Sequence, residues 1–79
     1  MATFEQIFKI KEGHTLKEVR AHHGNYDDDW NHEERDAQGE LVARYESWDY
    51  MAPRQPHILG WLKFSPDGRL LEEHDELPL

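Results

Sequence analysis

The chain has 79 residues, of which 37% are apolar, and 17 acidic against 9 basic side chains give it a formal charge of −8. This length fits one domain with a small core. The absence of cysteine excludes disulfides and thiolate metal sites. The acidic balance disfavours direct binding to nucleic acid, because no excess of cations is present to displace phosphate counterions. The sequence therefore predicts a single small acidic domain with neither a disulfide framework nor a nucleic-acid interface.

The N-terminal segment, residues 4–11, fits two patterns. Phe4, Ile7 and Phe8 have the spacing of a helix face, whereas Phe8 and Ile10 alternate with lysines as in a strand. The β-branched and aromatic content favours strands. We therefore expect a strand over residues 4–11.

The next segment carries helix signals. Thr15 followed by Glu18 matches a capping box, and Gly24 is a typical residue just past a helix end. These signals predict a short helix over residues 16–23, with a hairpin strand as the alternative. An acidic loop is expected over residues 25–29.

One turn pattern occurs twice, at residues 36–42 and 65–71. Each copy has a turn-starting residue, two permissive residues, a glycine, a charged residue and two aliphatics. Gly39 and Gly68 fall where a left-handed residue closes a hairpin after a type I turn. The two turns predict an antiparallel meander over residues 30–74, with strands at 30–35, 40–50, 58–64 and 69–74 and a two-proline loop at 51–57.

These elements predict a mainly β fold with a minor α+β character, namely a small antiparallel meander of four to five strands with one short N-terminal helix. One domain spans residues 1–79. It is divided into an N-terminal strand, helix and acidic loop (1–29), the meander (30–74) and a tail (75–79). The N-terminus lacks a secretory signal pattern and no apolar run is long enough to cross a membrane, so a cytoplasmic bacterial or phage protein is expected.

Both faces of the expected sheet carry apolar side chains. In the strand at 58–64, Ile58 and Leu62 point one way while Leu59 and Trp61 point the other. The sheet must curl, or the N-terminal segments or a partner must cover a face. An aromatic group can serve either as core or as a partner-binding strip, and its members are Tyr45, Trp48, Tyr50, Trp61 and Phe64.

Residues 60–73, GWLKFSPDGRLLEE, resemble one unit of the short bacterial MORN-variant repeats and of the related tyrosine–aspartate repeats. The shared features are Gly-Trp, an aromatic before the turn, Asp-Gly, leucine and a terminal glutamate. The upstream copy, residues 32–45, has Arg35 in place of the aromatic. The resemblance implies a β-hairpin module, antitoxin-like in character, that has a structural or protein-binding role and no catalytic residues.

No metal or cofactor is expected. His22, His23 and His32 flank an aspartate run, but adjacent histidines on a helix point about 100° apart and chelate one ion poorly. The pattern DxDxN at residues 27–31 resembles the start of an EF-hand loop. Its sixth position is His32 where an EF-hand has glycine, and its twelfth position is Gln38 where an EF-hand has glutamate.

The sequence therefore predicts a non-catalytic protein-interaction module that acts as an inhibitor, an antitoxin-like protein or an accessory factor. We expect no enzyme activity, because a thin core leaves little room for a catalytic cleft. A homodimer would help to stabilise so small a core. The expected partner contacts are Trp48, Tyr50, Arg54, Trp61, Asp27, Asp28 and Asp29.

The alternative is an acidic mimic of nucleic acid that occupies the basic groove of a DNA- or RNA-binding protein. It would act through the aspartate run together with Glu72 and Glu73. This alternative requires that both acidic clusters share one face.

Overall fold

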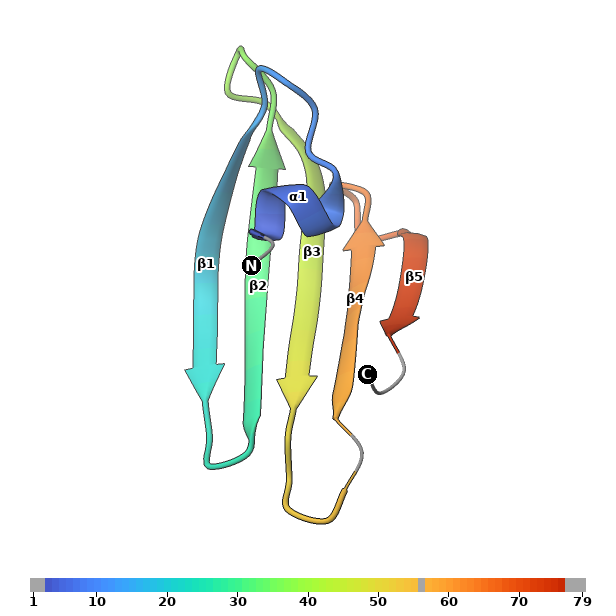
Figure 1. Ribbon diagram of the computed structural model, residues 1–79. Helices are drawn as coiled ribbons and strands as arrows, with labels where there is room; N and C mark the ends of the chain where they lie inside the picture. Colours follow the sequence, from blue (N-terminus) through green and yellow to red (C-terminus); the bar gives the residue numbers. More distant parts are fainter. Residues whose placement is uncertain (1–2, 56, 77–79) are drawn as a thin grey trace.

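The computed structural model describes residues 3–55 and 57–76 as one short helix followed by five strands (Figure 1). The strands form a single antiparallel sheet in the order β1-β2-β3-β4-β5, so each strand pairs with its neighbours in the sequence. The predicted mainly β meander with one short N-terminal helix is confirmed. The elements are α1 (Phe4–Phe8), β1 (Thr15–His23), β2 (Asp27–Arg35), β3 (Leu41–Tyr50), β4 (Ile58–Phe64) and β5 (Leu70–Glu76).

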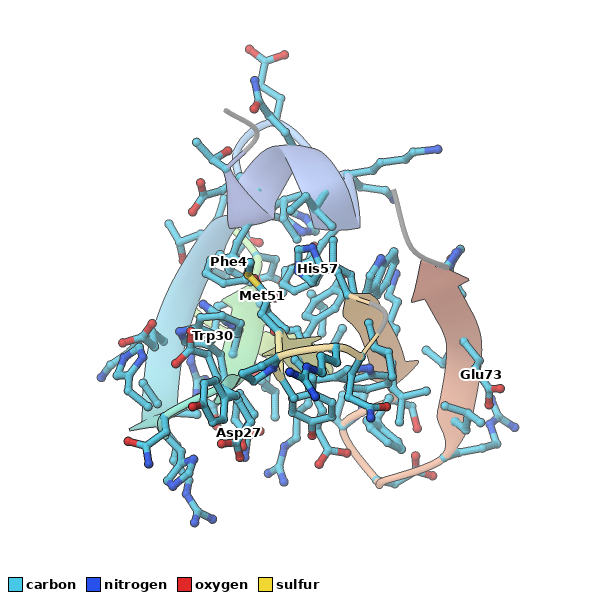
Figure 2. The ribbon with its side chains drawn as sticks, turned by 60° about the horizontal axis from the view of Figure 1, so that its bottom comes forward. Phe4, Asp27, Trp30, Met51, His57 and Glu73 are labelled. Atoms are coloured by element: carbon cyan, nitrogen blue, oxygen red, sulfur yellow. The ribbon has the colours of Figure 1, made fainter. Side chains whose placement is uncertain are left out.

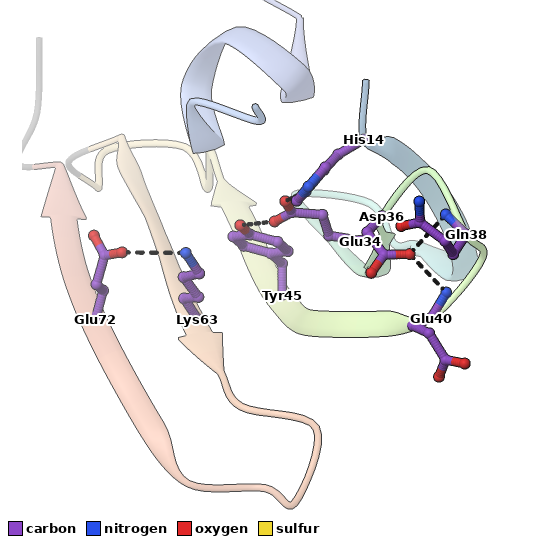
Figure 3. Close-up of polar contacts among 8 residues, drawn as sticks. All are labelled: His14, Glu34, Asp36, Gln38, Glu40, Tyr45, Lys63 and Glu72. Atoms are coloured by element: carbon purple, nitrogen blue, oxygen red, sulfur yellow. Dashed lines mark hydrogen bonds and ion pairs between the residues drawn. The ribbon is translucent and has the colours of Figure 1, made fainter. Parts of the chain in front are cut away.

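The two repeated turns connect β2 to β3 and β4 to β5, as predicted. Gly39 and Gly68 have φ of 85° and 92°, a left-handed conformation that glycine adopts without strain. Each glycine N–H donates to the carbonyl of the turn's first residue, Asp36 at 3.0 Å and Ser65 at 2.9 Å. The Asp36 carboxylate also accepts the N–H of Glu40 at 3.0 Å (Figure 3). The turn chemistry therefore fixes both hairpins.

The N-terminal elements are the reverse of the prediction, so the strand expected over 4–11 and the helix expected over 16–23 are both wrong. The capping box lies at Thr3, whose side chain accepts the Gln6 N–H at 3.3 Å while its own N–H donates to the Gln6 side chain at 2.9 Å. A five-residue helix is marginal on its own. Packing of Phe4 and Phe8 against the sheet supplies the remaining stability.

Residues 15–23 form a strand instead of a helix, because the residues on both sides of Val19 pair with β2. The register runs from Thr15 opposite Arg35 to His23 opposite Asp28, with an irregularity at Val19. Backbone pairing thus outweighs the local capping signal, and the alternative of a hairpin strand holds.

The expected acidic loop is also wrong, because Asp27–Asp29 begin β2 and the turn occupies only residues 24–26. Of the expected tail at 75–79, Asp75 and Glu76 continue β5, and residues 77–79 lie outside the described part of the chain.

The core lies between α1 and the sheet, where α1 crosses β2 and β3 (Figure 1). The Phe8 ring stacks on Tyr45 with a centroid distance of 4.2 Å and lies 5.0 Å from the ring of Trp61. The fully packed apolar side chains are Phe8, Ala43, Tyr45 and Trp61. We call this side of the sheet the helix face. Within residues 3–55 and 57–76, no helix is long and apolar enough to cross a membrane.

The opposite side, which we call the open face, has no described element packed on it. Side chains alternate between the faces. Because Tyr45 and His32 are buried under α1, their strand neighbours point to the open face. This face carries Asp27, Asp29, Asn31 and Glu33 of β2, Arg44, Glu46, Trp48 and Tyr50 of β3, and Ile58, Leu62 and Phe64 of β4.

Candidate functional site

Four of the predicted contact residues meet at the end of the open face that is distant from the β2–β3 turn. Asp27 lies opposite Tyr50, and Asp29 lies opposite Trp48, in a stretch of β2 and β3 without register irregularity. Opposed residues on one face have their Cβ atoms about 4.5–5.5 Å apart. We call these four residues the acidic–aromatic patch. In Figure 2, Asp27 lies on the side of the sheet away from α1, whereas Phe4 lies on the α1 side.

A glycine in the neighbouring strand positions the aromatic part of this patch. Gly60 lies opposite Trp48, and a Cβ atom at Gly60 would come within 2.4 Å of the indole ring. The ring of Trp48 therefore rests directly on the β4 backbone and is half-buried, while Tyr50 is exposed. Such support lowers the conformational entropy that Trp48 would lose on binding.

Asp28 does not belong to the patch, because it points to the other face of the sheet. Its carboxylate lies 3.0 Å from the Nδ1 atom of His23. It is opposite Asp49, whose carboxylate lies 2.5 Å from the Nε2 atom of His57. Each of these opposed aspartates thus has its own imidazole, which offsets their mutual repulsion. Asp28 therefore lies on the opposite face from Asp27 and Asp29, and its role in partner binding stays a prediction.

Trp61 is likewise separated from Trp48, because the register places Gly60 rather than Trp61 opposite Trp48. Trp61 is only 7% exposed and stacks on His74 at 4.1 Å. The predicted Trp48/Trp61 surface therefore does not exist, and Trp61 is a core residue. Arg54 is exposed in the loop between β3 and β4, where it has a positive φ of 62°.

Farther along the open face lies a shallow hollow of about 330 Å³. It lies over β2 and β3, with Val19 of β1 on one side, Phe64 of β4 on the other and the charged residues Glu33, Arg44 and Glu46 between them. This hollow could not be predicted from the sequence, because it depends on the Val19 irregularity and on the register of four strands.

A buried polar network lies on the helix face (Figure 3). The Tyr45 hydroxyl donates to Glu34 Oε1 at 2.7 Å, and His14 Nδ1 lies 2.5 Å from Glu34 Oε2. Burial raises the pKa of Tyr45, and the adjacent Glu34 carboxylate raises this pKa further. Both Glu34 oxygens are therefore satisfied, although the residue is only 5% exposed. This network could not be predicted from the sequence, since residues 14, 34 and 45 come from three separate segments.

Five histidines lie beside carboxylates, and His32 differs from them. It is 4% exposed, its ring centroid lies 4.4 Å from that of Phe4, and its Nδ1 atom has no hydrogen-bond partner among the described residues. Desolvation lowers its pKa below the ordinary value of 6.5, against an opposing effect of Glu18 and Glu5. The paired histidines are His14, His22, His23, His57 and His74.

The two acidic clusters required for nucleic-acid mimicry are separated. Glu72 lies opposite Lys63 and Glu73 opposite Leu62, so their side chains point to different faces of the sheet. Strand β5 is three positions away from β2 in the sheet, a separation of about 14 Å at the usual strand spacing. The five acidic residues therefore do not form one continuous row.

Comparison of the chain with known protein families, with curated proteins and with solved structures finds no match.

Proposed function

We propose that this protein is a non-catalytic protein-interaction module, an inhibitor, antitoxin-like protein or accessory factor, that binds its partner through the acidic–aromatic patch. The observation that supports this function is the placement of Trp48 and Tyr50 beside Asp27 and Asp29 on the open face. Tryptophan and tyrosine dominate the energetic centres of protein interfaces. Domains usually consist of two packed layers, and the open face lacks a second layer.

The patch suits a partner that presents an arginine or lysine. The faces of Trp48 and Tyr50 attract a cation, and the carboxylates of Asp27 and Asp29 accept its hydrogen bonds. Arg54, in the adjoining loop, stands close in sequence to Tyr50 and would contribute at the rim. A guanidinium fits better than an ammonium, because it stacks on a ring and donates to a carboxylate at the same time.

A comparative capture experiment tests this function. Wild-type protein and the Tyr50→Ala variant serve as baits in an extract of the source cells, with Ile7→Ala as the matched control, since Ile7 is exposed on α1. We expect a partner that wild type and Ile7→Ala retain and that Tyr50→Ala loses. Circular dichroism confirms that each bait is folded. Equal capture by all three baits contradicts the proposal.

Ionic strength separates this proposal from nucleic-acid mimicry, the alternative function. Mimicry through many carboxylates loses affinity steeply between low and physiological ionic strength, because surface charges are screened by salt. Docking through the patch loses less affinity, because only the contacts of Asp27 and Asp29 are screened and those of Trp48 and Tyr50 are not. The separation of the acidic clusters gives mimicry less support. It would be favoured if Asp27→Asn abolished capture while Tyr50→Ala did not.

We propose a cytoplasmic location and kinship with the MORN-variant hairpin repeats, for which residues 60–73 are the supporting segment. A homodimer through the open face is a further option for covering its apolar side chains. Sedimentation velocity at several concentrations measures this directly.

A further inference from the structure

The end of the β1–β2 hairpin brings together three side chains that can bind a metal. The helix expected over 16–23 would have placed His22 and His23 on neighbouring sides of one helix. In strand β1 they point to opposite faces instead. His22 therefore shares the open face with Asp29, which lies directly opposite it, and with Asp27 two positions along β2.

The distances among these side chains suit coordination of a single ion. One ligand atom from each of His22, Asp27 and Asp29 lies within 4.8 Å of the other two. The His22 Nδ1 and Asp29 Oδ2 atoms are 3.5 Å apart. Ligands at about 2.0–2.1 Å from a tetrahedral zinc ion are separated by about 3.3 Å, so this pair needs little adjustment.

The charge of the cluster also calls for a cation. Two carboxylates lie on one face here, and among the described residues their only ion-pair contact is that between Asp29 and His22. Among the described residues, the ion pairs that involve lysine or arginine are Arg35–Glu33 and Lys63–Glu72, and neither includes Asp27 or Asp29. A divalent ion would neutralise both carboxylates.

The hairpin turn holds Asp27 in this position. The Gly24 N–H donates to the Asp27 carbonyl at 2.7 Å, and the Asp27 carboxylate occupies the space in which a side chain of residue 24 would lie. A Cβ atom at Gly24 would come within 2.2 Å of Asp27 Oδ1. The glycine thus leaves room for the carboxylate between the two strands.

We propose that His22, Asp27 and Asp29 form a binding site for a divalent transition-metal ion of the zinc class, with water completing the coordination. An imidazole nitrogen favours zinc, nickel or copper over calcium and magnesium, which prefer oxygen ligands throughout. The EF-hand interpretation of residues 27–31 does not hold, because these residues form an extended strand instead of a loop that encloses an ion.

Isothermal titration calorimetry with Zn²⁺ on the protein without an affinity tag tests this site. The test variant is His22→Gln and the matched control is His23→Gln, since both histidines are exposed, lie beside an aspartate and differ in the face to which they point. We expect one Zn²⁺ per chain for wild type, an affinity at least about tenfold lower for His22→Gln, and an unchanged affinity for His23→Gln. Titration with Ca²⁺ should give no comparable heat.

Co²⁺ provides a second measurement, because its visible absorption reports whether the coordination is tetrahedral. Absence of Zn²⁺ binding by wild type, or equal losses for His22→Gln and His23→Gln, overturns the site. Circular dichroism shows whether each variant is folded. The metal site shares Asp27 and Asp29 with the acidic–aromatic patch, but His22→Gln leaves both aspartates, Trp48 and Tyr50 intact. Loss of metal binding and loss of partner capture are therefore separately observable.

Discussion

At the scale of single residues, His32 is the least compensated titratable group in the described chain. It is packed against Phe4 and Phe8, with one ring nitrogen unpaired. A buried imidazole without a partner favours its neutral form, which explains the direction of its pKa shift. Its protonation must therefore be coupled to loosening of the core beneath α1.

This coupling predicts a pH-dependent loss of stability. Because the pKa of His32 in the folded state lies below 6.5, the unfolded chain binds the proton more readily between these two values. The stability that neutral His32 contributes is fully present above the pKa of the unfolded state. It is lost as the pH falls towards the pKa of the folded state. Urea unfolding at about pH 7.5 and pH 5 of wild type and His32→Leu measures it.

We expect His32→Leu to gain stability relative to wild type at the lower pH. The five histidines that contact carboxylates are common to both proteins and largely cancel in the difference. An identical difference in unfolding free energy at the two pH values would show that His32 is not the responsible group.

The sequence identifies the residue types of the candidate site but does not assign them to faces of the sheet. The side chains of Trp48, Tyr50, Asp27 and Asp29 share the open face, whereas Trp61 lies on the helix face. The seven residues between Tyr50 and Ile58 set the register, and nothing in that loop specifies whether residue 60 or 61 lies opposite Trp48. A shift of one position would exchange the two faces.

At the scale of elements, the accuracy of prediction follows the strength of the local signals. The glycine turns at 39 and 68 fix β2 to β5 because their chemistry is local. Strand β1 has few apolar residues, only Leu16 and Val19 besides Ala21, so its pattern is weak and its capping signal misleads. Helix α1 shows helical spacing at Phe4, Ile7 and Phe8, but it is too short for this spacing to outweigh its β-branched and aromatic content. Both N-terminal elements are decided by tertiary contacts.

The pairing of β3 with β4 leads to a prediction about Gly60. Replacement by alanine forces the Trp48 ring away from the β4 backbone, with an expected loss of about 1–3 kcal/mol in unfolding free energy. The same replacement in a Trp48→Ala background should be neutral or slightly stabilising, because alanine restricts the unfolded chain more than glycine does. Denaturant unfolding of the four proteins forms a double-mutant cycle. A coupling energy near zero would mean that Trp48 does not rest on Gly60.

At the scale of the whole molecule, α1 is the only described element that gives the sheet a second layer. Its attachment depends on Phe8, which is 4% exposed and contacts the rings of Tyr45, Trp61 and His32. The neighbouring residue Ile7 is 40% exposed. Much of the packing between this one helical turn and the sheet therefore comes from the Phe8 side chain.

Phe8→Ala should lower the free energy of unfolding by about 3–5 kcal/mol or prevent folding. The neighbouring Ile7→Ala should change it by about 0.5 kcal/mol or less, as is usual for surface sites. Thermal unfolding followed by near-ultraviolet circular dichroism compares the two variants. Similar melting temperatures would show that α1 does not hold the aromatic core together.

Within the described part of the chain, β1 and β5 each have one backbone edge that pairs with no other strand, and another chain could add a strand there. Charged side chains line both borders, with Lys17, Glu18 and Arg20 along β1 and Glu72 and Glu73 along β5. The irregularity at Val19 also interrupts the straight row of donors and acceptors on β1. Ionised side chains therefore oppose the addition of a strand from another chain at these edges. Strong acid neutralises the glutamates and removes much of that protection at the β5 edge.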